Sequence, residues 1–575
     1  MKNLTLTLSL IMAFSLVGYK KDTSKPLPFA KNKNKTMSLS VPEPASPAAP
    51  LAPVIPARIH NVRNYNALPN DNGDDRVNIQ RAINALRDAG GGTLQFPAGT
   101  YNLTIDPQSG EYKQAIQLYS KIRLAPQPGA IVNLKLSNNQ GPYYAIFNAQ
   151  GTEHTSIESL KFDQNGLNNK ISLSEMDYAG GLVELGSVRQ ILAFSGAKRF
   201  KIHGCTFDNV LGVWVIFNAG ADGSSDATIT NNVCKNVGGN DFDFDVSVIY
   251  TDCDRALVSG NSVTGRFTGA KGARTAFEIH GSDQNVTGNT IDKMLVGINI
   301  VGHKQATETD PNSVVNRQSY TLNKMTNVYN GFQFWTYKEQ NFSDITVANN
   351  NITLVVDNFF NKGLPLFAAG QYAPVFGIGI KDWATTNPIS RVKIHKNTIL
   401  FTNFGSILED PAFDAASYSA GISLATLNDN KVGISDLIVT KNTVVSSLSS
   451  GFYSLIHLNR AKISANTFQD PGLMAYYTGG PQPNDPYWDN FTTSHQSGVY
   501  VWSKDGSTVS SVTISSNITN NTAEAPCIVK FGSIGEATTD DTNSKLLRNT
   551  VTGGGSGTIA ERRGTGWNGT KIRGN

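Results

Sequence analysis

The chain has few cysteines for its length, few charged residues and no long apolar run after its first residues. Four cysteines in 575 residues are too few for a disulfide framework, and no CxxC pair or Cys/His zinc spacing occurs. Charged residues make up 16% of the chain and the formal net charge is +4, without a basic run. We therefore expect no nucleic-acid partner. We also expect no integral membrane span, because no later segment is long and apolar enough.

The N-terminus carries its own signals. Residues 1–18, "MKNLTLTLSLIMAFSLVG", combine a lysine with a short apolar run, which is typical of a secretory signal peptide. Tyr19 stands where a lipidated cysteine would follow, so the pattern favours ordinary bacterial-type export, to the exterior, the periplasm or the cell surface. Residues 19–57 include "PEPASPAAPLAPVIP", which predicts a flexible, extended Pro/Ala-rich linker. We expect one folded domain over residues 58–575.

A repeat dominates that domain. Segments such as "VTGNTI", "VANNNI" and "VTKNTV" place an asparagine between apolar residues, often at steps of twenty to thirty residues. The repeated asparagines are Asn232, Asn261, Asn289, Asn350, Asn397, Asn442, Asn466 and Asn549. One short strand per repeat cannot bury its apolar face alone, whereas stacked coils bury a continuous column. The pattern predicts an all-β fold, a right-handed parallel β-helix, with the asparagines bonded from coil to coil.

The segment before the coils differs from them. "NDNGDDRVNIQRAINAL" predicts a helix that Asp74 and Asp75 cap, with Val77, Ile79, Ala82, Ile83 and Leu86 on its apolar stripe. "GGGTLQFPAGTY" then predicts a turn and a strand. Such an amphipathic helix would cover the open end of the first coil.

Together, residues 61–103 resemble the N-terminal signature of the pectate lyase-like superfamily of parallel β-helix proteins. The resemblance implies the fold, the N-terminal capping α-helix, and action on polysaccharides as a lyase, glycoside hydrolase or epimerase, or a tailspike-like role. The ordered motif "NTD…DD…GHG…RIK" of polygalacturonases is absent, which counts against that activity.

A second strand of each coil brings chemical groups together. Aligning "VIYTDCD", "AFEIHGS", "GINIVGH", "GFQFWTY" and "GIGIKDW" sends their isoleucines and phenylalanines inward. Two outward rows result, which we list as Tyr250, Glu278, Asn299, Gln333, Gly379 and Ser423, and as Asp252, His280, Val301, Trp335, Lys381 and Ala425. We expect Tyr250, Asp252, Glu278 and His280 to lie side by side on an exposed sheet face as the catalytic group.

Two reactions suit this group. In a lyase on a uronate-containing glycan, His280 or Tyr250 would move protons, and Asp252 would hold His280 in one tautomer. In an inverting glycoside hydrolase, Asp252 and Glu278 would act as acid and base. Their diagonal of about 8 Å between Cα atoms is compatible with the range of about 6.5–9.5 Å for such carboxyl groups. A third alternative is a non-catalytic glycan-binding or adhesin β-helix.

Further residues complete the predicted site. Candidates to bind the substrate are Arg274, Asn299, Gln333, Trp335 and Lys381. Asp241, Asp243 and Asp245 alternate on an extended segment and are candidate ligands of Ca²⁺, the one cofactor we consider. The sequence favours an exported, monomeric enzyme that cleaves a polysaccharide, a lyase before a hydrolase.

Overall fold

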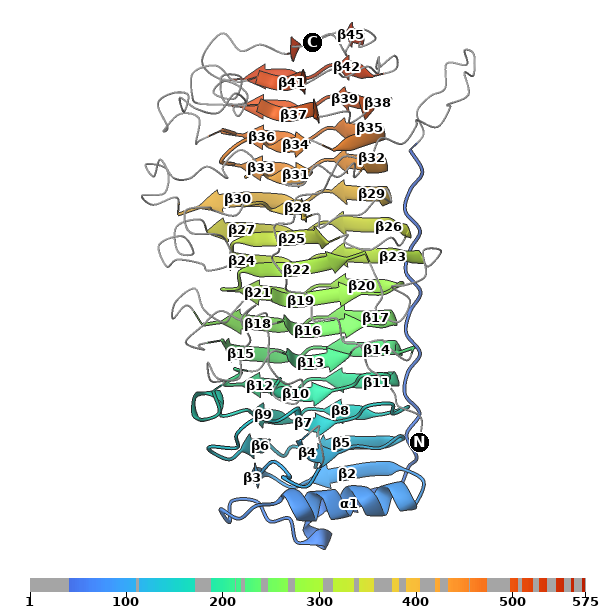
Figure 1. Cartoon of the computed structure of the whole chain (residues 1–575), viewed down its shortest axis with the longest axis vertical. Helices are drawn as coiled ribbons and strands as arrows, with labels where there is room; N and C mark the ends of the chain where they lie inside the picture. The colour runs from blue at the N-terminus through green and yellow to red at the C-terminus, as the bar shows by residue number, and fades with distance from the viewer. Residues whose placement is uncertain are drawn as a thin grey trace, which may run out of the picture.

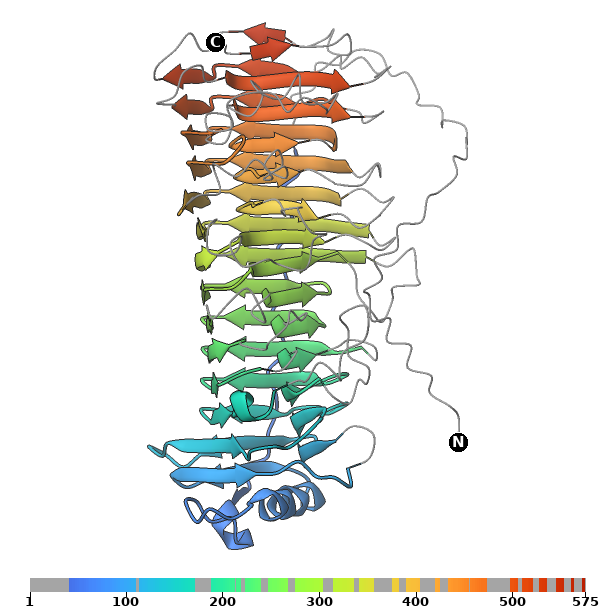
Figure 2. The ribbon, with the colours of Figure 1, turned by 60° about the vertical axis from the view of Figure 1, so that its left-hand side comes forward.

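The structure, a computed structural model, describes most of the chain after residue 40. The described residues are 41–109, 113–170, 188–211, 214–218, 223–238, 247–266, 275–302, 314–335, 341–355, 375–381, 389–403, 419–424, 433–454, 456–472, 497–504, 509–520, 527–534, 544–552, 560–562 and 571–573. They form a single stack of coils, as Figures 1 and 2 show from two sides. The described part of the chain has one α-helix, α1 (Arg76–Asp88), and two 3-10 helices, Val62–Tyr65 and Gly166–Asn168.

Within the described residues, the paired strands are parallel and build three sheets, here named A, B and C. From β4 onward most coils contribute one strand to C, then one to A, then one to B, and each strand pairs with its counterpart in the next coil. Because the strand order C, A, B recurs from coil to coil, the chain winds as the parallel β-helix that its sequence repeat predicted. The predicted right-handed β-helix fold with an N-terminal helical cap is confirmed.

The strands have the following bounds. Sheet A contains β1 Ile59–Asn61, β2 Gly92–Phe96, β5 Ile122–Pro126, β8 Ser156–Glu158, β11 Lys198–His203, β14 Ser225–Thr230, β17 Asp254–Ser259, β20 Gln284–Thr287, β23 Val314–Thr321, β26 Asn341–Ala348, β29 Ile389–His395, β32 Gly433–Thr440, β35 His457–Ser464, β38 Val509–Ser510, β39 Thr513–Ser515, β42 Lys545–Leu547 and β45 Lys571–Arg573. Sheet B contains β3 Gly99–Leu103, β6 Val132–Leu136, β9 Lys161–Asp163, β12 Thr206–Asp208, β15 Val233–Val237, β18 Ser262–Gly265, β21 Thr290–Asp292, β24 Lys324–Val328, β27 Asn351–Val355, β30 Thr398–Thr402, β33 Thr443–Val445, β36 Thr467–Gln469, β40 Ile518–Asn520 and β43 Thr550–Thr552. Sheet C contains β4 Gln114–Gln117, β7 Ala145–Asn148, β10 Gln190–Ala193, β13 Trp214–Asn218, β16 Ser247–Asp252, β19 Thr275–His280, β22 Val296–Val301, β25 Asn330–Trp335, β28 Ile378–Lys381, β31 Ile422–Leu424, β34 Phe452–Ser454, β37 Ser497–Lys504, β41 Cys527–Ile534 and β44 Ala560–Arg562.

The core is a column of apolar side chains that runs through the stack. The inward residues predicted for sheet C are all buried in it, namely Ile249, Phe277, Ile279, Ile298, Ile300, Phe332, Phe334, Ile378 and Ile380. One coil alone would leave this face open to water, so the column is completed by stacking.

The asparagines form a buried ladder at the turn between sheets A and B. In each step an asparagine donates its backbone N–H and its Nδ2 to Oδ1 of the asparagine in the next coil, as Asn232 does to Asn261 at 3.0 and 2.9 Å. The ladder confirms the predicted bonding and includes two residues that the repeat search missed, Asn323 and Asn517. The left-handed conformation belongs to the residue before each asparagine, for example Asn231 and Asn349.

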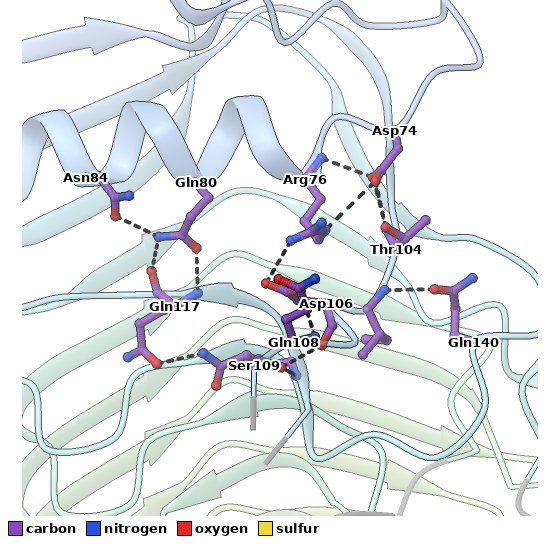
Figure 3. A network of polar contacts seen from close by, with 12 residues as sticks. Asp74, Arg76, Gln80, Asn84, Thr104, Asp106, Gln108, Ser109, Gln117 and Gln140 are labelled. Atoms are coloured by element: carbon purple, nitrogen blue, oxygen red, sulfur yellow. Dashed lines mark hydrogen bonds and ion pairs between the residues drawn. The ribbon is translucent and has the colours of Figure 1, made fainter. Parts of the chain in front are cut away.

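The helix α1 covers the first coils and is tied to them by side chains (Figure 3). Gln80 exchanges hydrogen bonds with the backbone of Gln117 in β4, at 2.8 and 3.1 Å, and Arg76 pairs with Asp106 at 3.0 Å. The prediction that both aspartates cap the helix holds only in part: Asp74 accepts the Arg76 backbone N–H at 3.1 Å, but the N-cap residue Asp75 makes no side-chain cap hydrogen bond and accepts instead from the backbone N–H groups of Leu68 and Asn102. The predicted stripe is buried except for Val77, which is 49% exposed because it lies on the outer side of the helix.

Residues 41–57, for which the sequence predicted a flexible linker, run instead as an extended strap along sheet A. In Figure 1 this blue segment passes beside the strands from β5 to β29. Backbone N–H groups of the strap donate to Asp344, Asp283, Asp226 and His154, which lie on separate coils. The strap is therefore packed on the solenoid, and the folded part of the chain begins before residue 58.

Candidate functional site

The predicted outward rows of sheet C have the expected register. Tyr250 in β16 pairs with Glu278 in β19, and Asp252 pairs with His280. The first row continues through Asn299, Gln333, Gly379 and Ser423. The four residues predicted as the catalytic group thus lie side by side on two neighbouring coils.

Two of these side chains are in direct polar contact. Oε1 of Glu278 lies 3.2 Å from Nε2 of His280, and Oε2 of Glu278 accepts a hydrogen bond of 2.6 Å from the Ser247 hydroxyl. Both oxygens of one carboxylate are thereby oriented. The sequence proposed that Asp252 would hold the His280 ring, but the carboxylate at Nε2 is that of Glu278, since alternate residues on one strand point the same way.

The prediction that this face is exposed was wrong. Asp252, His280 and Tyr250 are 0%, 1% and 5% exposed, while the side chain of Glu278 is 14% exposed. Lateral packing along the row contributes to the burial of Tyr250 and His280. The Tyr250 ring lies 4.8 Å from the His280 ring and 5.1 Å from that of Phe217 in the preceding coil. Glu278 is the most accessible member of the group.

An aromatic cluster adjoins the group on its N-terminal side and was missed by the sequence analysis. The Trp214 ring stacks on Phe217 at 4.3 Å and meets Tyr250 edge-on at 5.9 Å. Phe217 pairs with Tyr250 and so extends the first row by one coil, whereas Trp214 pairs with Ser247, the residue that donates to Glu278. Extending the strand alignment one coil toward the N-terminus, from "SVIYT" to "WVIFN", would have found them. A partly exposed indole beside polar groups offers a flat apolar face of the kind that stacks on a sugar ring.

The remaining predicted site residues divide into two sets. Asn299 and Gln333 follow Glu278 in its row and are each 4% exposed, and Trp335 pairs with Lys381 in the other row. The structure describes the backbone of Lys381 in β28 but not its side chain. Four further predicted residues lie outside the described residues altogether: Arg274, Asp241, Asp243 and Asp245. Their roles stay predictions.

Within the described residues, no three His, Cys, Asp or Glu side chains gather closely enough to hold a metal ion. The described part of the chain also has no helix with the length and apolar character needed to cross a bilayer.

Comparison with known proteins gives a fold and one short sequence match. No protein-family model matches the chain. A structure of the tailspike protein of E. coli bacteriophage HK620 aligns over 85% of this chain and 77% of its own, at 15% identity and a TM-score of 0.50. A second structure of that tailspike, in complex with a pentasaccharide, covers 85% and 78% at 15% identity and a TM-score of 0.48. The mannuronan C5-epimerase AlgE4 of Azotobacter vinelandii is 42% identical over 52 residues, which is 9% of this chain and 9% of that protein.

The chain is thus a right-handed parallel β-helix protein, in agreement with its resemblance to the pectate lyase-like superfamily. At 15% identity the likeness to the tailspike concerns the fold alone, and a fold of this kind carries many functions. The chemistry has to be argued from the side chains of sheet C.

Proposed function

We propose that the protein is a carbohydrate-active enzyme that cleaves a uronate-containing polysaccharide by β-elimination, on the outer face of sheet C. The observation that carries the proposal is the contact of 3.2 Å between Glu278 Oε1 and His280 Nε2, beside the Tyr250 ring. A carboxylate, an imidazole and a phenol are the groups that proton transfer requires, and register places them together.

The reaction moves two protons and consumes no water. A base removes the hydrogen on C5, next to the uronate carboxyl group. The C4–O4 bond then breaks as a C4–C5 double bond forms, and the departing O4 takes up a proton. Glu278 suits the first role, because it is the most accessible of the four residues and Ser247 and His280 orient both of its oxygens. Tyr250, adjacent in register, suits the second.

The short match to an epimerase supports the same first step. The name of that enzyme describes inversion at C5 of a mannuronate polymer, and inversion at that carbon begins with removal of the same hydrogen. The negative charge that develops on the uronate carboxyl group needs a partner. Asn299, next to Glu278 in the row, is the nearest candidate, and Arg274, Lys381 and a calcium ion remain proposals for this role.

Hydrolysis is the second candidate. It is favoured by the position of a second carboxylate, Asp252, on the strand next to Glu278. An inverting enzyme needs both carboxyl groups to reach the substrate or a water molecule. Asp252 is fully buried, and for this reason we propose hydrolysis only as the second candidate.

The test is a screen on acidic and neutral polysaccharides that records ultraviolet absorbance and reducing ends together, in water enriched in ¹⁸O. Elimination gives absorbance from the new double bond without ¹⁸O in the product. Hydrolysis gives reducing ends with ¹⁸O and no such absorbance, and would overturn the proposal. Binding without any product would indicate an adhesin.

Single replacements then test the site. We expect Glu278→Gln and His280→Ala each to lower turnover at least about 100-fold, the lower bound for loss of general acid–base catalysis. Ser423→Ala is the matched control, since it changes a buried polar residue of the same row four coils away. Full turnover in Glu278→Gln would rule out its role as the base.

A further inference from the structure

The strap of residues 41–57 has a period of three. Prolines stand at positions 44, 47, 50, 53 and 56. Each of these prolines is half-buried, whereas the two residues between successive prolines are exposed from Ala45 to Val54, and Leu51 and Val54 are 53% and 69% exposed. Burial of every third residue is the signature of a polyproline-II helix, which has three residues per turn.

The surface beneath the strap has a period of two coils. At one position of sheet A, aspartate and arginine alternate from coil to coil, in the order Asp226, Arg255, Asp283, Arg317, Asp344, Arg391, Asp436 and Arg460. We call this set the Asp–Arg row. Arg199 and His154 occupy the same position in the two preceding coils. All ten residues have a left-handed backbone, with φ between 52° and 62°.

Each aspartate of the row is held by the arginine of the next coil. Arg317 donates from Nε and a terminal nitrogen to the two oxygens of Asp283, at 2.6 and 2.8 Å, and the other three pairs repeat this two-point geometry. Two parallel charge-assisted bonds fix a carboxylate in place. Its lone pairs can then accept a further donor.

The strap supplies that donor at every second coil. The backbone N–H of Leu51 donates to Asp226 at 3.0 Å, that of Ala48 to Asp283 at 2.9 Å, and that of Ala45 to Asp344 at 3.3 Å. The N–H of Val54 donates to Nδ1 of His154 at 3.0 Å. Each donor follows a proline, so three residues of strap advance the chain by two coils.

The two periods match in length. Three residues of polyproline-II advance about 9.3 Å at a rise of about 3.1 Å per residue. Two coils of parallel strands advance about 9.6 Å at about 4.8 Å per strand. A β-strand covers a similar distance in three residues but alternates its faces every two. An α-helix advances only about 4.5 Å in three residues. Polyproline-II is therefore the backbone whose every third N–H can meet this row.

We propose that the Asp–Arg row is a recognition site for a polyproline-II segment with proline at every third position, and that residues 41–57 are its built-in ligand. The strap carries the chain from β29, where Glu43 pairs with Lys393, to the α1 end of the solenoid (Figure 1). Asp436 marks the end of the match. It is held by Arg460 like the others, but the residue three places before Ala45 is Pro42, which has no N–H to donate.

That end point gives a matched pair of variants. Hydrogen–deuterium exchange of the full chain should show the strap amides protected. Asp283→Ala should raise the exchange rate at Ala48 and the neighbouring strap amides by about tenfold, the loss of one hydrogen bond to a charged group. Asp436→Ala breaks an identical ion pair and should leave strap exchange unchanged. Unprotected strap amides in the unaltered chain, or equal effects of the two variants, would overturn the proposal.

A second pair alters the strap itself and leaves the core untouched, because residues 41–57 contribute no side chain to the core cluster. Ala48→Pro and Ala49→Pro both favour polyproline-II, but the first removes the N–H that meets Asp283. We expect the amides of Ala45 and Leu51 to exchange faster in Ala48→Pro than in the unaltered chain, and at the unaltered rate in Ala49→Pro. The circular dichroism should be unchanged in both variants. Faster exchange in both variants would show that packing, and not the spaced N–H groups, holds the strap.

Discussion

Replacing Asn350 with alanine should destabilise the solenoid far more than the same replacement at Asn351. The Asn350 side chain makes four buried hydrogen bonds. Its Oδ1 accepts from the backbone N–H and Nδ2 of Asn323, at 2.9 and 3.0 Å, and its Nδ2 donates to Tyr320 O and Asn397 Oδ1, at 3.0 and 2.9 Å. Asn351, one residue later, is exposed at the start of β27.

The magnitude follows from the groups that lose their partners. Nδ2 of Asn323 keeps the Val286 carbonyl, and Oδ1 of Asn397 keeps the Asn350 backbone N–H. The N–H of Asn323 and the carbonyl of Tyr320 lose the side-chain partner. Each buried polar group left unsatisfied costs about 1–3 kcal/mol. We therefore expect the free energy of unfolding to fall by about 2–6 kcal/mol in Asn350→Ala, and by less than about 0.5 kcal/mol in Asn351→Ala, as for a surface change.

The assay is urea denaturation followed by circular dichroism, with the midpoint and the slope compared among the three chains. A lowered midpoint at an unchanged slope identifies a loss of stability. If Asn350→Ala unfolds at the same urea concentration as Asn351→Ala, the asparagine ladder contributes no net stability and the reasoning from unsatisfied groups fails.

Two further predictions concern pH and metal. Burial raises the pKa of Asp226, Asp283 and Asp344, but the hydrogen bonds from arginine and from the strap backbone, together with the arginine charge, lower each pKa from its ordinary 3.8. A carboxyl group whose pKa is lower in the folded state stabilises that state at any pH above its unfolded-state pKa. This stabilisation is lost as the pH falls through the folded-state pKa. The strap should therefore stay docked above about pH 4 and detach in stronger acid. A fluorescent label on Ser46→Cys should then lose anisotropy, and constant anisotropy down to global unfolding would contradict this. If calcium assists the proposed elimination, EDTA should abolish activity and added Ca²⁺ should restore it, whereas full activity in EDTA would exclude a required ion.

Much of the fold could be predicted because it depends on short-range patterns. An asparagine between apolar residues recurs in most coils from Asn232 to Asn549. Apolar alternation gave the inward residues of sheet C, together with the pairing of Tyr250 with Glu278 and of Asp252 with His280. The ladder members Asn323 and Asn517 were missed, since the coils around them differ in length. Asn466 and Asn517 are 51 residues apart, and Asn442 and Asn466 only 24.

The accessibility of the candidate site could not be predicted from the same patterns. Alternation says that a side chain points away from the core, but it does not say how closely its neighbours pack. Phe217 and His280 lie on either side of Tyr250 in successive coils, and their rings shield one another. The contact of Glu278 with His280 was not anticipated, because it depends on side-chain rotamers that the sequence does not specify.

The strap and its row show why some order in a solenoid is visible in the sequence and some is not. The prolines of the strap repeat within one continuous segment, so their period of three can be read directly. The Asp–Arg row has an equally regular period in space, yet Asp344 and Arg391 are 47 residues apart and Asp436 and Arg460 are 24 apart. Strand pairing restores the register in every coil, so loops of any length leave the row intact. A linear segment can therefore match a row whose members are scattered through the sequence, and that match becomes apparent when the coils are stacked.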